Sequence, residues 1–115
     1  MRRPLLVSLT SCIVFLSGYA SAAPLPDDVA RARAAFAEGL AEARAGDHER
    51  ARASFLAAYG RIPSVDILWN LAVTEQKLGR DVDARRHLRE YAAHPSARAD
   101  RKEEIARELE PALAR

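Results

Sequence analysis

The sequence is poor in cysteine: Cys12 is the only one, and it lies within the first 22 residues. We expect those residues to be cleaved from the mature chain. The remaining chain would then contain no disulfide, no thiolate nucleophile and no cysteine-bound metal. Strand-like patterning is also lacking, because no stretch alternates strictly between apolar and polar residues. These absences exclude a disulfide-stabilised scaffold and favour a helical protein.

A surplus of one charge is missing as well. The full chain has 18 Lys and Arg residues against 16 Asp and Glu, a formal net charge of +2. Arg2 and Arg3 precede the expected cleavage point and every acidic residue follows it, so the rest of the chain is neutral. A protein that binds nucleic acid non-specifically needs excess cations to displace counterions from phosphates. We therefore expect no nucleic-acid partner.

The first 22 residues have the pattern of a secretory signal peptide. A basic start is followed by a mostly apolar run over residues 5–16 and by the small residues Ala20-Ser21-Ala22. We expect cleavage between Ala22 and Ala23. The pattern predicts an exported protein, either periplasmic or secreted.

Two other interpretations of this segment remain open. One is that it is kept as a membrane anchor, although its apolar run is shorter than the roughly 20 residues of a spanning helix. Alternatively, Leu9-Thr10-Ser11-Cys12 resembles a lipobox, which would place a lipid on Cys12. In either case we expect membrane contact only through this segment.

Helical periodicity continues from residue 27 to residue 113. Residues 23–26 contain two prolines and form an extended leader to a domain at residues 27–115. We expect helices at about 28–45, 47–59, 65–78, 81–93 and 96–113. The expected N-caps are Asp27, Asp47, Ser64 and Asp81, and the expected stop signals are Gly46, Gly60, Pro63, Gly79 and Pro95. Pro111 should end or kink the last helix near Glu110.

Residues 46–64 and 79–96 are similar to each other at an offset of 33. At this offset Phe36 aligns with Trp69, Gly39 with Ala72, Gly46 with Gly79, Ala51 with Ala84, and Phe55 with Leu88. Gly39 and Ala72 are small at the point where two helices of a hairpin would cross. Short turns predict that consecutive helices pack antiparallel.

This pattern resembles the tetratricopeptide repeat, a helical hairpin of about 34 residues. The residues that carry the resemblance are Gly39, Gly46, Ala51, Phe55, Ala58 and Pro63 in the first unit and Leu71, Ala72, Gly79, Ala84, Leu88 and Pro95 in the second. The chain also resembles small exported tetratricopeptide proteins of bacteria.

The resemblance implies an all-α fold with about two antiparallel hairpins, at residues 32–64 and 65–97, and a C-terminal capping helix at about 96–113. Both units depart from the family by carrying a glutamate, Glu42 or Glu75, where it prefers an aromatic residue. An unrelated antiparallel helical bundle is the alternative.

The same resemblance implies a non-catalytic interaction module, because the family's first helices line a concave surface that binds a peptide or a partner helix. Carried over by position, that surface would contain Arg33, Phe36, Ala37, Leu40, Arg44, Asp66, Trp69, Asn70, Val73 and Lys77. Asn70 matches the asparagine that binds the ligand backbone in peptide-binding members. Phe36, Leu40 and Trp69 are equally consistent with a core position.

Nothing in the titratable residues indicates catalysis. His48, His87 and His94 form no metal-binding motif, and we expect all three on the surface. We therefore predict no enzymatic activity, no metal and no cofactor. The alternative function is structural: the repeats would mediate self-association, for example as a homodimer in an envelope assembly, without a separate ligand groove.

Overall fold

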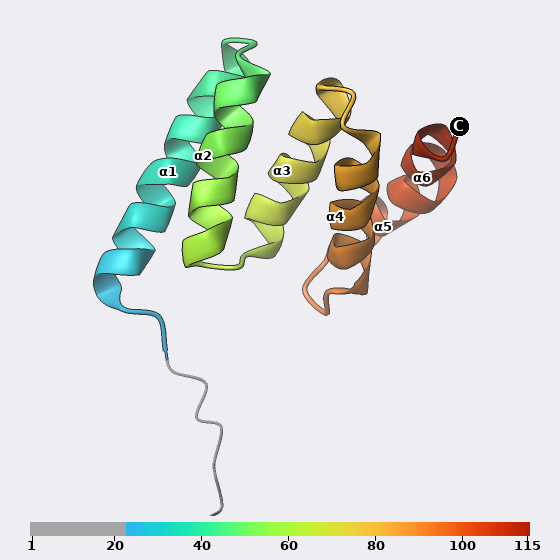
Figure 1. The fold of residues 1–115 in the computed structure, drawn as a ribbon. Helices are drawn as coiled ribbons and strands as arrows, with labels where there is room; N and C mark the ends of the chain where they lie inside the picture. The colour runs from blue at the N-terminus through green and yellow to red at the C-terminus, as the bar shows by residue number, and fades with distance from the viewer. Residues whose placement is uncertain (1–22) are drawn as a thin grey trace, which may run out of the picture.

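The computed structural model describes residues 23–115. The expected signal peptide, its cleaved residue Ala22 and the lipobox cysteine Cys12 lie outside the described residues. The described chain is all α-helical, as predicted, with two antiparallel hairpins and a C-terminal helix in three parts (Figure 1). The elements are α1 (Pro26–Arg44), α2 (His48–Arg61), α3 (Val65–Lys77), α4 (Asp81–Ala93), α5 (Ala99–Glu104), η1 (Ile105–Leu109) and α6 (Glu110–Leu113).

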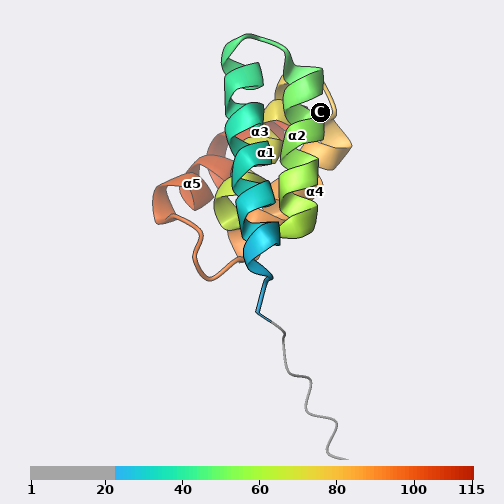
Figure 2. The same ribbon diagram turned by 90° about the vertical axis from the view of Figure 1, so that its left-hand side faces the viewer.

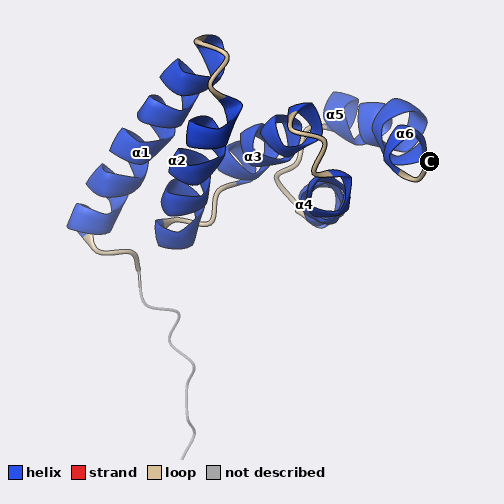
Figure 3. Cartoon of the chain, turned by 45° about the horizontal axis from the view of Figure 1, so that its top comes forward, coloured by secondary structure: helices blue, strands red, loops and turns tan. Residues whose placement is uncertain are grey.

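Consecutive elements pack in chain order, with α1 against α2, α2 against α3, and α3 against α4. Seen along this array, α5 projects on the side opposite to α2 and α4 (Figure 2). Only helices and connecting loops occur over the described residues (Figure 3). None of these helices combines the length and the apolar character that crossing a membrane would require.

The turns inside the two hairpins are built alike. Gly46 and Gly79 have positive φ values of 81° and 71°, which glycine adopts without steric cost. In each turn the residue after the glycine donates its N–H to a carbonyl of the preceding helix: Asp47 to Glu42 and Arg80 to Glu75. These are Schellman turns. The predicted stop signals at both glycines are confirmed.

The helix starts agree less well with the predictions. Asp47 caps α2 as expected, because its carboxylate accepts the N–H of Arg50. However, α1 begins at Pro26 and α4 at Asp81, so Asp27 and Asp81 lie in first turns and are not N-caps. Proline suits the first helical position because its φ is preset and no N–H bond is lost. Acidic side chains in a first turn still stabilise the helix, because their negative charge interacts favourably with the helix dipole.

Two other predicted caps or stops also need correction. Ser64 stands at the N-cap of α3, but its side chain makes no capping hydrogen bond. Helix α2 runs through Gly60 and ends at Arg61, and Ile62 is already extended. Pro63 explains this end, because the residue before a proline is disfavoured in the helical region.

The core consists of two clusters of buried side chains. The first joins α1, α2 and α3 and contains Ala51, Phe55, Ala58, Ile67 and Leu71. The second joins α3, α4 and the C-terminal helix and contains Leu68, Ala72, Ala84, Leu88, Tyr91, Ile105 and Leu113. The C-terminal helix therefore covers the second hairpin, as its sequence predicted.

Of the two outcomes expected for Pro111, an end or a kink near Glu110, the end does not occur; instead the helix changes to a π-helical turn just before the proline. The helix begins at Ala99 and continues to Leu113. A π-helical turn over η1 lets the N–H of Glu110 reach the carbonyl of Ile105, five residues back. Pro111 follows directly and has no N–H to donate. The wider turn accommodates the proline and keeps both Ile105 and Leu113 buried.

Candidate functional site

The ten residues predicted to form a binding surface all lie on α1 or α3, and none is fully buried. We call the surface formed by these residues the α1/α3 face. Arg33, Ala37, Arg44, Asp66 and Lys77 are exposed, and Phe36, Leu40, Trp69, Asn70 and Val73 are partly buried. On each helix the first and last of these residues are 11 positions apart. Because 11 residues make about three helical turns, each set follows one side of its helix.

A cleft lies at the end of this face where α1 and α3 begin. It has a volume of about 280 Å³ and is lined by Val29, Ala32, Arg33, Phe36, Ile62, Ser64, Asp66 and Ile67. Most of these side chains are apolar. The cleft thus brings together three residues of the predicted surface: Arg33, Phe36 and Asp66.

The apolar residues of the α1/α3 face are shared with the core. Phe36 and Leu40 pack against the first cluster, and the Phe36 and Phe55 rings are 5.7 Å apart, centroid to centroid. Trp69 packs against Tyr91 at 5.2 Å. The Arg101 guanidinium of α5 lies 4.6 Å from the Trp69 ring centroid, a cation–π arrangement. In the second hairpin, therefore, α5 covers part of the predicted surface.

Asn70 is also engaged within its own helix. Its side-chain nitrogen donates to the backbone carbonyl of Asp66 at 2.8 Å, and the hydroxyl of Thr74 donates to the backbone carbonyl of Asn70 at 2.8 Å. These bonds hold the amide against α3. A ligand at this position would meet an oriented amide group.

The cations of the α1/α3 face are not neutralised. Within residues 23–115, Arg33, Arg44 and Lys77 have no carboxylate at ion-pair distance. Asp66 is the one acidic residue of the face, and Arg101 approaches it at 3.8 Å. The α1/α3 face therefore carries an excess of positive charge, although residues 23–115 together have no formal net charge.

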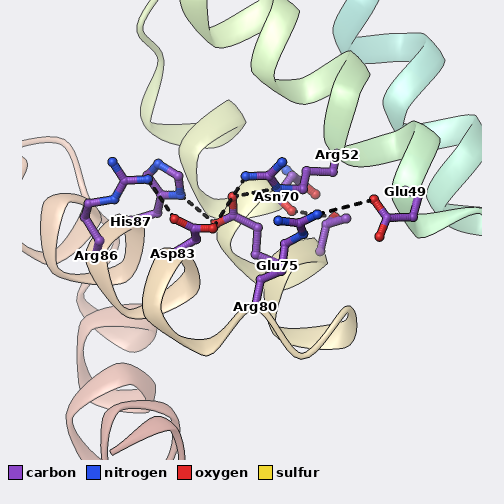
Figure 4. Close-up of polar contacts among 9 residues, drawn as sticks. Glu49, Arg52, Asn70, Glu75, Arg80, Asp83, Arg86 and His87 are labelled. Carbon is purple, nitrogen blue, oxygen red and sulfur yellow. Dashed lines mark hydrogen bonds and ion pairs between the residues drawn. The ribbon is translucent and has the colours of Figure 1, made fainter.

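A second cluster, which we call the Glu75 junction, lies between the hairpins and contains Arg52, Glu75, Asp83 and His87 (Figure 4). Glu75 is fully buried. One of its oxygens accepts a hydrogen bond from Arg52 Nε at 3.0 Å, and the other lies 2.6 Å from His87 Nδ1. Arg52 also approaches Asp83 at 3.6 Å. The Glu75 junction therefore links α2, α3 and α4.

The prediction of a surface position for His87 is wrong, because its side chain is buried against Glu75. The repeat held the signal. Glu42 and Ser54 precede Glu75 and His87 by the same 33 residues, and Ser54 donates to Glu42 at 2.7 Å. The second helix of each hairpin thus supplies a polar partner to the glutamate of the first helix.

The Glu75 junction is better suited to holding the helices together than to binding or converting a substrate. Both oxygens of Glu75 are already engaged by Arg52 and His87, so neither is directed at a site for a substrate. Over residues 23–115 no three His, Cys, Asp or Glu side chains are grouped as they would be around a metal ion.

One further polar contact joins the second helices of the two hairpins, α2 and α4. The hydroxyl of Tyr59 on α2 donates a hydrogen bond to Glu90 on α4. Burial raises the pKa of Tyr59 to about 12, and the hydrogen bond to Glu90 and its negative charge act in the same direction. The contact holds α2 to α4 only while the phenol keeps its proton.

No family model matches this chain, and no curated protein or solved structure is significantly similar to it. The geometry of the α1/α3 face is therefore the basis for assigning a function to the chain.

Proposed function

We propose that this protein is an exported, non-catalytic interaction module of the tetratricopeptide type, which binds a peptide or a partner helix on the α1/α3 face. The observation that carries the proposal is the apolar cleft between the starts of α1 and α3, which is bordered by the unpaired Arg33. A concave, mostly apolar site with a few polar groups is the usual form of a binding pocket.

The repeated construction of the hairpins supports the assignment to a repeat protein. The Schellman turns recur at Gly46 and Gly79, and the glutamate pairs recur at Glu42 and Glu75. The apolar cluster of each hairpin is completed by the element that follows it, which is the packing principle of repeat arrays. The C-terminal helix provides that neighbour for the second hairpin.

Capture from an envelope extract of the source organism tests the proposal. The double variant Asn70→Ala, Lys77→Ala should keep its helicity and lose the proteins that the unchanged protein retains. Arg31→Ala is the matched control, because Arg31 lies on α1 and pairs with Asp27 away from the cleft. Equal retention by the double variant and the control would contradict a binding role for the α1/α3 face.

Light scattering of the purified protein tests the structural alternative. A module with an open face should be monomeric, since Phe36 and Trp69 are already packed within their own chain. A stable dimer that is lost on substitution of Arg33 or Lys77 would instead assign the α1/α3 face to self-association.

A further inference from the structure

The positive charge of the α1/α3 face results from how the ion pairs are distributed. Most other arginines of residues 26–93 already have a carboxylate nearby: Arg31, Arg50, Arg52, Arg61, Arg80, Arg86 and Arg89. On the face itself, Arg33, Arg44 and Lys77 have none among residues 23–115. The charge that this face offers to a partner is therefore positive, although residues 23–115 together have no formal net charge.

The spacing of these cations suits an elongated partner. Arg33 and Arg44 are 11 residues apart on one side of α1, a separation of roughly 16 Å at 1.5 Å per residue. Lys77 ends the corresponding side of α3. Arg33 lines the cleft, whereas Arg44 and Lys77 lie at the opposite ends of their helices. A single small anion would not reach all three.

The volume of the cleft limits the size of the apolar group that a partner can insert. Its volume of about 280 Å³ is just below the range of roughly 300–1,000 Å³ that is typical of pockets for drug-sized molecules. Val29, Phe36 and Ile67 form much of its apolar lining. A cleft of this size has room for one large apolar side chain inserted from a longer segment.

We propose that the partner is an acidic peptide segment that inserts one large apolar side chain into the cleft and sets its carboxylates against Arg33, Arg44 and Lys77. This inference rests on the proposed function and names the class of its ligand. Asp66 does not oppose it, because Arg101 lies beside that carboxylate. Burial of the apolar side chain supplies affinity, and the charges favour acidic partners over basic ones.

Fluorescence polarisation with three short labelled peptides tests the proposal. The first carries one leucine among Glu and Asp residues, the second replaces that leucine with serine, and the third replaces the acidic residues with lysine. The first peptide should bind about tenfold or more tightly than either of the others. Its binding should weaken as salt concentration rises, because exposed charges are screened.

Charge reversal locates the binding site. Arg33→Glu should weaken binding of the acidic leucine peptide by about tenfold, and Arg31→Glu should leave it nearly unchanged. The two residues are two positions apart on α1 and therefore face different directions. Arg31 belongs to an exposed pair with Asp27, so its reversal costs little stability.

Equal binding of the acidic and basic peptides would overturn the proposal of an acidic partner. Equal effects of Arg33→Glu and Arg31→Glu would overturn it as well. Loss of extract capture in Asn70→Ala, Lys77→Ala would still support binding at the α1/α3 face, so only the ligand class would fail. If neither extract capture nor peptide binding depends on the face, the proposed function itself fails.

Discussion

At the scale of single residues, one close contact decides which side chains the first hairpin tolerates. A Cβ atom added at Gly39 would lie 2.6 Å from a ring carbon of Phe55. The Phe55 ring is buried in the first core cluster and cannot move without disturbing it. Gly60 is also helical, but a Cβ added there would meet nothing within 4 Å. The two glycines therefore differ in their surroundings and not in their backbone.

This difference predicts opposite effects of the same substitution. Gly39→Ala should lower the free energy of unfolding by about 1–2 kcal/mol, because overpacking outweighs the gain in helix propensity. Gly60→Ala should raise it by about 0.5–1 kcal/mol, because only the propensity changes. Urea unfolding followed by circular dichroism measures both. Shifts in the same direction would show that Phe55 does not restrict the Gly39 site.

At the scale of secondary-structure elements, the helices are joined by polar contacts as well as by apolar packing. Tyr59 and Glu90 join α2 to α4, which are not consecutive in the chain. A phenol that is hydrogen-bonded to a carboxylate resists deprotonation, since its ionised form would place two negative charges together. The contact should therefore be lost at alkaline pH, where Tyr59 gives up its proton.

The raised pKa of Tyr59 sets the direction of this pH dependence. The unfolded chain loses the phenol proton near pH 10, whereas the folded protein holds it to about pH 12. The stabilisation is therefore complete below pH 10 and is lost as the pH rises towards 12. Phenolate absorbance, taken as the difference from Tyr59→Phe, should show the high midpoint, and Glu90→Gln should lower it. A midpoint near 10 in both proteins would contradict the contact.

At the scale of the whole molecule, the hairpins are held together by α2 against α3, and the Glu75 junction is central to that interface. Its glutamate is buried and needs both Arg52 and His87. The equivalent Glu42 pairs with Arg50, but the Arg50 side chain is 71% exposed, whereas the Arg52 side chain is 20% exposed. The same type of pair therefore has different energetic importance in the two hairpins.

Removing one arginine at a time measures this difference. Arg52→Ala should lower the free energy of unfolding by about 3 kcal/mol, because it leaves a buried carboxylate short of a partner. Arg50→Ala should cost less than about 1 kcal/mol, as exposed pairs do. Chemical unfolding followed by Trp69 fluorescence measures both. Equal losses would show that Glu75 does not depend on Arg52 in the folded protein.

The sequence by itself determined the helices, their approximate ends and the repeat, because these depend on local signals. Gly46 and Gly79 end helices through their own backbone freedom, and Asp47 caps one through a bond to a residue three positions away. Gly39 also predicted the point where α1 and α2 approach each other closely. The helical period also placed the ten residues of the α1/α3 face on one side of two helices, and their role in binding stays a prediction.

Only the tertiary structure decided which of the predicted surface side chains are buried, covered by another helix or left without an ion-pair partner. His87 is polar and lies near the middle of an amphipathic helix, so its burial depended on Glu75 being opposite. Trp69 is partly covered because α5 returns across it with Arg101. Arg33 has no carboxylate at ion-pair distance among residues 23–115, although Asp66 lines the same cleft, and it is Arg101 of α5 that approaches Asp66. Burial and pairing depend on the partners that distant segments supply, and local periodicity does not specify those partners.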